Sequence, residues 1–319
     1  MNRKIKPLTH YPGVRNLILL LKKVSLPGFD NLPLYDVLVF FRNEIKRDVI
    51  SVRAKSIAFT FFMALFPGLL FLFTLIPYIP VPNLQANLIN LISEMLPAEA
   101  FRMLENTLMG VISQQRGELL SISLFTSLFL ATNGMMAVME SFDKSYATFI
   151  KRSGLKKRWV AFKLTLVLIF VLMISMGAIV AGNRLLRLLL QTFDILTPFN
   201  YLLFSTLKWV VILLLLFVSI SLIYYYGPAV KKKFRFISPG STVATLLVIF
   251  VSLGFSYFVN NFGQYNRIYG SIGAIIALQI FIYLNSFALL IGFELNAAIT
   301  ISKSIRKHSP LENIQDAGM

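Results

Sequence analysis

The sequence predicts an all-α membrane protein with six transmembrane helices. Six apolar stretches contain no charged residue, and each holds 18 to 25 residues: 56–80, 119–138, 164–182, 209–226, 240–259 and 272–293. An α-helix of this length can cross a hydrocarbon core of about 30 Å. Every charged residue falls between these stretches or at the two ends of the chain.

The basic residues predict the orientation of the spans. Of the 31 lysines and arginines, 25 lie in alternate segments of the chain, namely 1–55, 139–163, 227–239 and 294–319. The positive-inside bias places these segments in the cytoplasm, which gives an N-in, C-in topology. The net charge of +17 then reflects orientation and attraction to the anionic head groups of the lipid bilayer. We expect no nucleic-acid partner.

The composition argues against most enzymatic chemistry. The chain has no cysteine, and its two histidines, His10 and His308, lie one in each tail. Thiol nucleophiles, thiolate metal sites and a histidine-based general base therefore lack their residues. The sequence also has no phosphate-binding glycine loop of the Walker or dinucleotide type. We expect no enzyme activity, no metal and no cofactor.

The first 55 residues are expected to form a cytoplasmic amphipathic segment. Two helices, Gly13–Val24 and Pro33–Val52, are predicted on either side of a turn at 27–31. The second helix has apolar residues at helical spacing and basic residues on its other faces. Such a helix either lies along the membrane surface or packs against the inner loops of the protein.

The rest of the chain is expected to form one six-helix transmembrane domain, 56–299, and a cytoplasmic tail, 300–319. The outer segment 81–118 predicts two short helices, near 84–96 and 98–113. The segment 183–208 opens with an amphipathic turn or helix at Asn183–Arg187. A substrate pathway is the functional hypothesis for the polar residues within the spans.

Polar residues form two stripes inside the membrane domain. One stripe follows the second span through Thr126, Asn133 and Glu140, and the other follows the sixth span through Gln279, Tyr283 and Glu294. The predicted pathway residues are Asn133, Glu140, Gln279, Tyr283 and Glu294. Polar groups in hydrocarbon are costly, so they line a wet interior or form hydrogen bonds between helices. In the first case Glu140 and Glu294 border an inward-opening cavity and exchange protons. In the second, each pairs with a cation such as Lys144 or Lys303 and only fixes a helix end.

Two further features are candidates for function. Pro67, in the middle of the first span, removes a backbone hydrogen bond and is a candidate helix kink or gate. An outer polar loop is predicted around Asn261, Tyr265, Arg267 and Tyr269. Arg267 either binds a carboxylate or phosphate or pairs with an outer acidic residue, and the sequence favours neither.

Four sequence runs resemble the YihY/BrkB family of bacterial inner-membrane proteins. They are AFTFFMALFPGLLFL, ATNGMMAVMESFDKSY, YYYGPAVKKKFRFISPGSTVATLL and YNRIYGSIGAIIALQIFIYLNSFALLIGFELNAAI, and the likeness extends over roughly residues 35–300. The resemblance implies a multi-pass protein of the bacterial inner membrane. The family has an association with virulence and a historical ribonuclease BN label, and some members look like exporters of glycerol-phosphate-type or lipid-derived anions.

The sequence and the resemblance together favour a transporter or exporter of small anionic solutes. The alternative is a non-transporting membrane scaffold or envelope-assembly factor, and a ribonuclease is a remote third reading. The sequence is compatible with a homo-oligomer.

Overall fold

The fold is a set of α-helices joined by short segments. The computed structural model describes residues 32–47, 50–79, 114–192, 198–260 and 263–307, with a few short pieces outside these ranges. The elements are α2 (Leu34–Arg47), α3 (Ile50–Leu75), the 3₁₀ turn η2 (Ile76–Tyr78), α6 (Gly117–Ser141), α7 (Gly154–Thr192), α8 (Pro198–Tyr226), α9 (Pro239–Asn260) and α10 (Gly263–Lys307). The described part contains no β-strand, and one isolated bridge joins Phe149 to Val230.

Six helices are long and apolar enough to cross a membrane. They are α3, α6, α7, α8, α9 and α10, and they match the six predicted stretches in order. The first stretch, 56–80, continues past α3 into η2. The all-α prediction with six candidate spans is therefore confirmed, and the protein is a multi-pass membrane protein.

Several helices extend beyond the apolar stretches. The helix α7 continues through Asn183–Arg187 to Thr192, and α10 runs without a break from Gly263 to Lys307. The prediction of an outer polar loop is therefore wrong for Tyr265, Arg267 and Tyr269, which are helical, because polar side chains at the end of an apolar stretch do not end a helix. Asn261 lies outside the described residues, as do most of the predicted helices at 13–24, 84–96 and 98–113.

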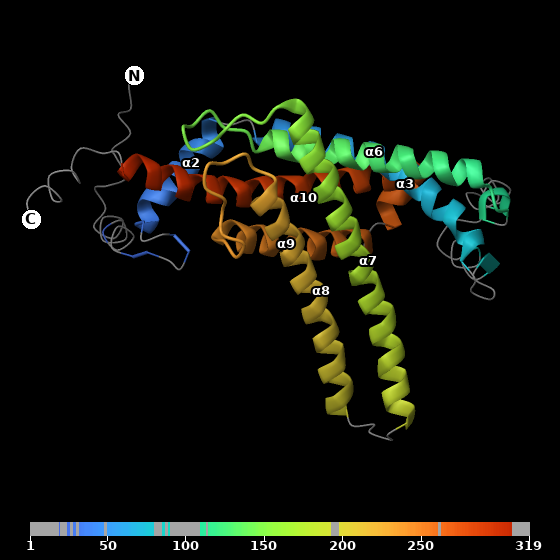
Figure 1. Cartoon of the computed structure of the whole chain (residues 1–319). Helices are drawn as coiled ribbons and strands as arrows, with labels where there is room; N and C mark the ends of the chain where they lie inside the picture. The colour runs from blue at the N-terminus through green and yellow to red at the C-terminus, as the bar shows by residue number, and fades with distance from the viewer. Residues whose placement is uncertain are drawn as a thin grey trace, which may run out of the picture.

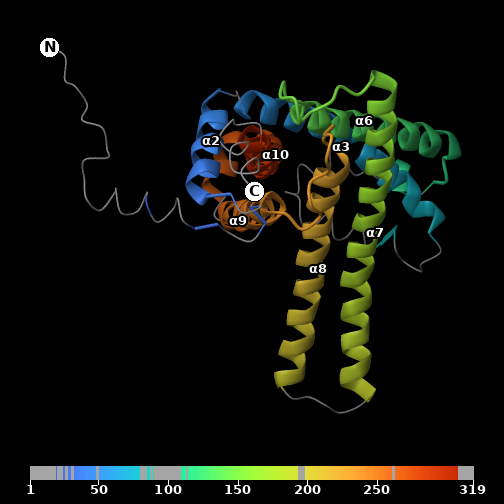
Figure 2. The ribbon, with the colours of Figure 1, turned by 60° about the vertical axis from the view of Figure 1, so that its left-hand side comes forward.

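The helices follow two main directions. Helices α3, α6, α9 and α10 run across Figure 1, and α9 and α10 are seen nearly end-on in Figure 2. Helices α7 and α8 run side by side down both views and project well beyond the other helices. The α7–α8 pair, hereafter the hairpin, is joined at its far tip by the segment between Thr192 and Pro198. Length and composition predict six spans, but they do not predict this steep angle between the hairpin and the other four helices, hereafter the helix layer.

The amphipathic helix α2 packs against the helix layer. Val37 of α2 is fully buried, and it belongs to an apolar cluster with Phe29, Leu32 and, from α10, Leu295, Ala298 and Ile299. Figure 2 shows α2 beside α10. Of the two roles predicted for this helix, the structure supports packing on the protein itself, although the partner is α10 rather than the inner loops.

The main core lies where the hairpin meets the helix layer. Its buried side chains come from all six long helices and the segments that join them, and the largest are Ile57, Met139, Phe142, Tyr224, Leu290 and Phe293. The hydroxyl of Tyr224, on α8, donates a hydrogen bond to the backbone oxygen of Leu289 on α10. This core therefore fixes the ends of α3, α6, α8 and α10 relative to one another.

Helices α9 and α10 cross at two glycines. A Cβ atom at Gly240 or at Gly292 would overlap the backbone oxygen of the other glycine, and one at Gly292 would also lie 2.6 Å from the Tyr224 hydroxyl. Small residues allow helix backbones to approach closely in membrane proteins. The crossing holds the first turn of α9 against the middle of α10.

Candidate functional site

A buried ion pair lies at the end of the helix layer. Lys144, just beyond the end of α6, places its Nζ atom 2.8 Å from Oε1 of Glu294 on α10, and the two side chains are 5% and 1% exposed. Arg53, from the first turn of α3, places Nη1 3.8 Å from the same oxygen and is 29% exposed. Three elements that are far apart in sequence thus bring their charges together.

An aromatic cluster lies beside this part of α10. The ring of Phe293, next to Glu294 in α10, stacks on Phe142 at a centroid distance of 4.2 Å, and Phe149 and Phe234 contact Phe293 at 6.4 and 6.1 Å. Apolar surroundings lower the local dielectric constant, which strengthens attraction between charges and raises the cost of an unpaired one. The pair is therefore strongly coupled to the fold around it.

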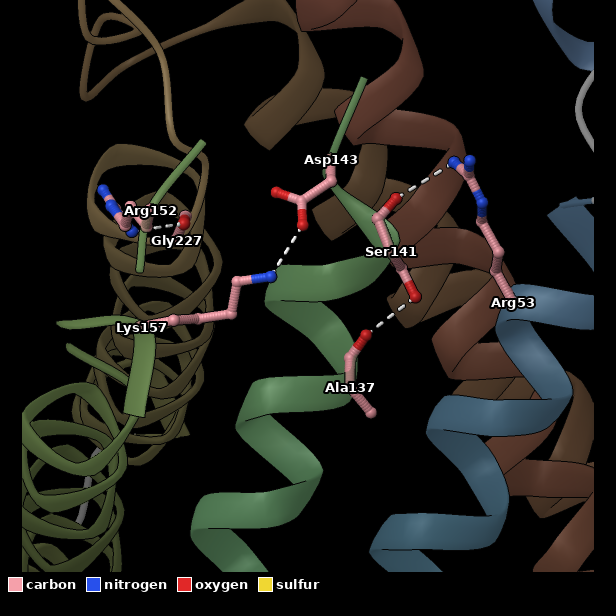
Figure 3. A network of polar contacts seen from close by, with 7 residues as sticks. All are labelled: Arg53, Ala137, Ser141, Asp143, Arg152, Lys157 and Gly227. Carbon is pink, nitrogen blue, oxygen red and sulfur yellow. Dashed lines mark hydrogen bonds and ion pairs between the residues drawn. The ribbon is translucent and has the colours of Figure 1, made fainter. Parts of the chain in front are cut away.

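Arg53 also secures the end of α6. Its Nη1 atom donates a 3.1 Å hydrogen bond to the backbone oxygen of Ser141, and the Ser141 hydroxyl donates to the backbone oxygen of Ala137 (Figure 3). The last carbonyl groups of a helix have no partner inside the helix, and a cation there interacts favourably with the helix dipole. One arginine thus contacts both the end of α6 and Glu294.

The α6–α7 loop, residues 142–153, connects this site to the hairpin. Asp143 accepts a 2.7 Å bond from Lys157 of α7, and Arg152 donates to the backbone oxygens of Tyr226, Gly227 and Pro228 at the end of α8 (Figure 3). Partial burial lowers the pKa of Arg152, and the charge of Asp143 opposes that change. Two backbone hydrogen bonds, Ile150 to Ala229 and Lys231 to Thr148, complete the connection.

The predicted polar stripe of α10 faces the protein. Glu294 is buried, Tyr283 is partly buried and packs against the main core, and Gln279 is partly buried. The Gln279 Oε1 atom is enclosed and has no hydrogen-bond partner among the described residues. These three predicted pathway residues therefore lie on one inward-facing side of α10, and their role in transport stays a prediction.

The predicted stripe of α6 is placed differently. Asn133 is partly buried, whereas Thr126 and Glu140 are exposed. Thr126 borders an apolar groove of about 690 Å³ between α6 and α7, which Phe125, Phe129, Trp159 and Phe162 also line. The structure thus leaves Glu140 exposed and buries Glu294, so the two carboxylates do not share one buried environment.

The remaining predicted residues are less informative. Helix α3 continues through Pro67, which is partly buried, and its role as a gate stays a prediction. The side chains of Tyr265, Arg267 and Tyr269 lie outside those that the structure describes. No group of three histidine or acidic residues that could hold a metal occurs in the described part of the chain.

Two further polar residues near this end of α10 were not among the predicted site residues. Arg53 lies in the basic segment before the first apolar stretch, where it resembles any other inner cation. Asn296 is buried beside the crossing of α9 and α10 and bonds to the first turn of α9. The sequence does mark Asn296, because it is a polar residue two positions after Glu294 in an otherwise apolar run.

Comparisons with known proteins agree with the resemblance seen in the sequence. The family described as "Virulence factor BrkB" matches residues 41–314. The chain is 30% identical over 258 residues to a protein of Bacillus subtilis (strain 168) named "Putative ribonuclease-like protein YfkH", covering 81% of this chain and 93% of that protein. A shorter match, 36% identical over 84 residues, links it to a UPF0761 membrane protein of Xanthomonas campestris pv. campestris (strain B100), covering 26% of this chain and 20% of that protein. No solved structure matches the chain.

Proposed function

The chain belongs to the virulence factor BrkB family, and on that premise we propose that it is a transporter or exporter of small anionic solutes in the inner membrane of a bacterium. The solutes are of the glycerol-phosphate or lipid-derived type. This function requires charged groups within the membrane domain and a positive potential at the inner surface.

The buried pair of Lys144 and Glu294 is the observation that carries the proposal. Ionisable residues inside a membrane bundle are rare, pair with one another and mark the pathways of substrates and ions. The pair joins α10 to the α6–α7 loop, and Arg53 of α3 lies beside it. A charged substrate or a proton that breaks this pair would change how three elements are held together.

The contacts among the four basic segments support the inward orientation. Arg53 belongs to segment 1–55, Lys144 to 139–163, Lys231 to 227–239 and Glu294 to 294–319, and contacts link these segments at one end of the helix layer. Because the positive-inside bias places basic segments in the cytoplasm, we assign this end to the inner face. A single cysteine at Ser153 should then resist an impermeant thiol reagent added to intact cells, and one at Thr197 should react. The reverse labelling would overturn the orientation.

Reconstitution into liposomes tests the transport function. Wild-type protein should accumulate radiolabelled glycerol 3-phosphate or phosphate at a rate that depends on pH. Glu294→Gln should flatten that dependence, since glutamine cannot exchange a proton, whereas Glu118→Gln, an exposed change at the start of α6, should not. Uptake by Glu294→Gln with an unchanged pH profile would mean that the pair only fixes helix ends.

A failure of the wild-type protein to move any of these solutes would favour the scaffold alternative. The hairpin supports that reading, because it projects from the helix layer with exposed apolar side chains on both helices. The ribonuclease reading rests on the name of a relative. With no cysteine and histidines only at positions 10 and 308, purified protein should not cleave RNA with or without divalent metal, and cleavage lost in Glu294→Gln would contradict the non-enzyme proposal.

A further inference from the structure

A small basic cavity lies at the same end of the molecule as the ion pair but on another side of α10. It has a volume of about 150 Å³ and is bounded by the α8–α9 segment, the start of α9 and the last turns of α10. The cavity has room for several water molecules, each of which occupies about 30 Å³ in the liquid. A group of about five non-hydrogen atoms, such as phosphate, is of comparable size.

The charge on the cavity wall has one sign. Lys232, Lys233, Arg235 and Lys303 all line the cavity, and none of the lining residues is acidic. Three of these cations fall within four positions of the α8–α9 segment, and Lys303 approaches from α10. Cations gathered on one wall attract an anion to the cavity.

Two buried and hydrogen-bonded polar side chains line the cavity. Asn296 and Ser238 line it and are 3% and 5% exposed. The Asn296 side chain accepts a 2.9 Å hydrogen bond from the Gly240 amide and donates one of 2.9 Å to the Ser238 hydroxyl. Because the Gly240 and Ser241 amides already bond to Asn296 and Ser238, the end of α9 is capped by the protein itself. An anion would therefore be held by the cationic side chains, with the α9 amides not involved.

One cation is held at the edge of the cavity. The Lys233 ammonium lies 4.3 Å from the centre of the Tyr225 ring and 4.6 Å from that of Tyr226. Two cation–π contacts restrict a side chain that would otherwise be flexible, which lowers the entropy cost of binding. The nearby Lys231 is also exposed but does not line the cavity, so a substitution of Lys231 serves as the control for one of Lys232.

We propose that this cavity is a binding site for a phosphate group, supplied either by a small phosphomonoester or by the head group of an anionic phospholipid. The site lies next to the face that we assign to the cytoplasm, where both sources occur. It goes beyond the transport proposal, because a non-transporting scaffold with this cavity would bind phosphate in the same way.

Binding measurements on the purified full-length protein test the site. Titration calorimetry in neutral detergent measures whether the protein binds inorganic phosphate or glycerol 3-phosphate, the soluble source of the phosphate group. Reconstitution in nanodiscs of phosphatidylcholine with phosphatidic acid, followed by quantification of the lipid that stays bound on purification, reports the head-group source. Saturable binding in the first arm, or retention of phosphatidic acid over phosphatidylcholine in the second, supports the site and identifies which source it takes.

The variants decide whether the binding belongs to this cavity. Lys232→Gln and Lys303→Gln should each weaken binding about tenfold, the loss expected for one charge-assisted hydrogen bond, and Lys232→Arg should keep it. Lys231→Gln should change it less than about twofold, because screened charges outside the cavity act weakly. The proposal is overturned by the absence of binding in both arms, or by an equal loss in Lys231→Gln and Lys232→Gln. Neither result tests solute uptake in liposomes, so the transport proposal is tested separately.

Discussion

The helix layer around Lys144 and Glu294 and the α7–α8 hairpin are both built from span-length apolar helices, but different interactions hold them. In the layer, Phe142, Phe293 and Glu294 are fully buried, and charged side chains connect α3, α6 and α10. On the hairpin, Phe170 and Met173 are more than half exposed. At the hairpin's base, polar contacts come from the α6–α7 loop and from the Tyr224 hydroxyl, which bonds to α10.

This difference shows which residues of a membrane protein determine how its helices pack against one another. Lipid tails are about as apolar as leucine side chains, so an apolar face does not choose between lipid and another helix. A buried charge, a glycine crossing or an arginine that caps a helix end does require a particular neighbour. The layer has all three. On the hairpin, Arg152 bonds to the end of α8 at the base. Substitutions should therefore have their largest effects in the layer.

The largest effect is expected at the crossing of α9 and α10. Gly292→Leu would force a side chain into the backbone of Gly240, and we expect a loss of at least about 3 kcal/mol in the free energy of unfolding, since overpacking of a tight contact is not relieved by small shifts. Gly177→Leu, on the hairpin, is the matched control, because no atom lies within 4 Å of a Cβ there. Thermal unfolding in detergent measures both. Equal losses at the two glycines would contradict the distinction between layer and hairpin.

The next largest effect is expected at the ion pair. Glu294→Gln leaves Lys144 buried without its carboxylate, and Lys144→Met leaves Glu294 with the more distant Arg53. Removal of one partner of a buried pair costs about 3–5 kcal/mol, whereas an apolar replacement of both is often tolerated. The double variant Lys144→Met/Glu294→Leu should therefore be more stable than Glu294→Gln alone. Strictly additive losses in the cycle of Lys144→Met, Glu294→Leu and the double variant would show that the two residues are not coupled.

The sequence predicted the helices and spans because apolar length is a local property. It left open whether the chain at Asn183–Arg187 forms a turn or a helix, and the structure shows helix there. It did not predict that α10 begins as early as Gly263, since the polar residues there are compatible with either helix or loop. Nor could it predict the steep angle of the hairpin, which depends on contacts between distant residues. The loop predicted at Tyr265, Arg267 and Tyr269 was wrong because a drop in hydropathy was interpreted as the end of a helix.

The candidate site was partly predictable for a different reason. Glu294 was identified because a carboxylate in an apolar run is costly, and Lys144 was named as one alternative partner. The structure brings these two together. The sequence did not predict Arg53 or the exposure of Glu140, because helical spacing gives the face a residue shares with its neighbours but not which face packs inward. Three-dimensional packing supplied that information.

A smaller effect is expected where the loop meets the hairpin. Arg152→Ala removes hydrogen bonds to three backbone oxygens at the end of α8, and we expect a loss of about 1–2 kcal/mol, in the range of charge-assisted bonds at a partly exposed position. Lys151→Ala, the exposed neighbour, should change the melting temperature little. Hydrogen exchange should also speed up in the last turn of α8 in the arginine variant. Protection that stays unchanged there would mean that the arginine does not hold the hairpin.

The smallest effect is expected on the exposed side of the hairpin. Phe170→Ala and Met173→Ala should each change the free energy of unfolding by less than about 0.5 kcal/mol in a lipid nanodisc. Both side chains are mostly exposed, so lipid tails of similar polarity contact them in the native protein and fill the space after truncation. Leu164→Ala, at the buried base of the same helix, is the control and should cost about 2–5 kcal/mol. A loss of similar size at Phe170, together with a lower mass in light scattering, would show that a second copy covers this face. The comparison would then change: the hairpin would also be held by specific contacts, supplied by another molecule of the same chain.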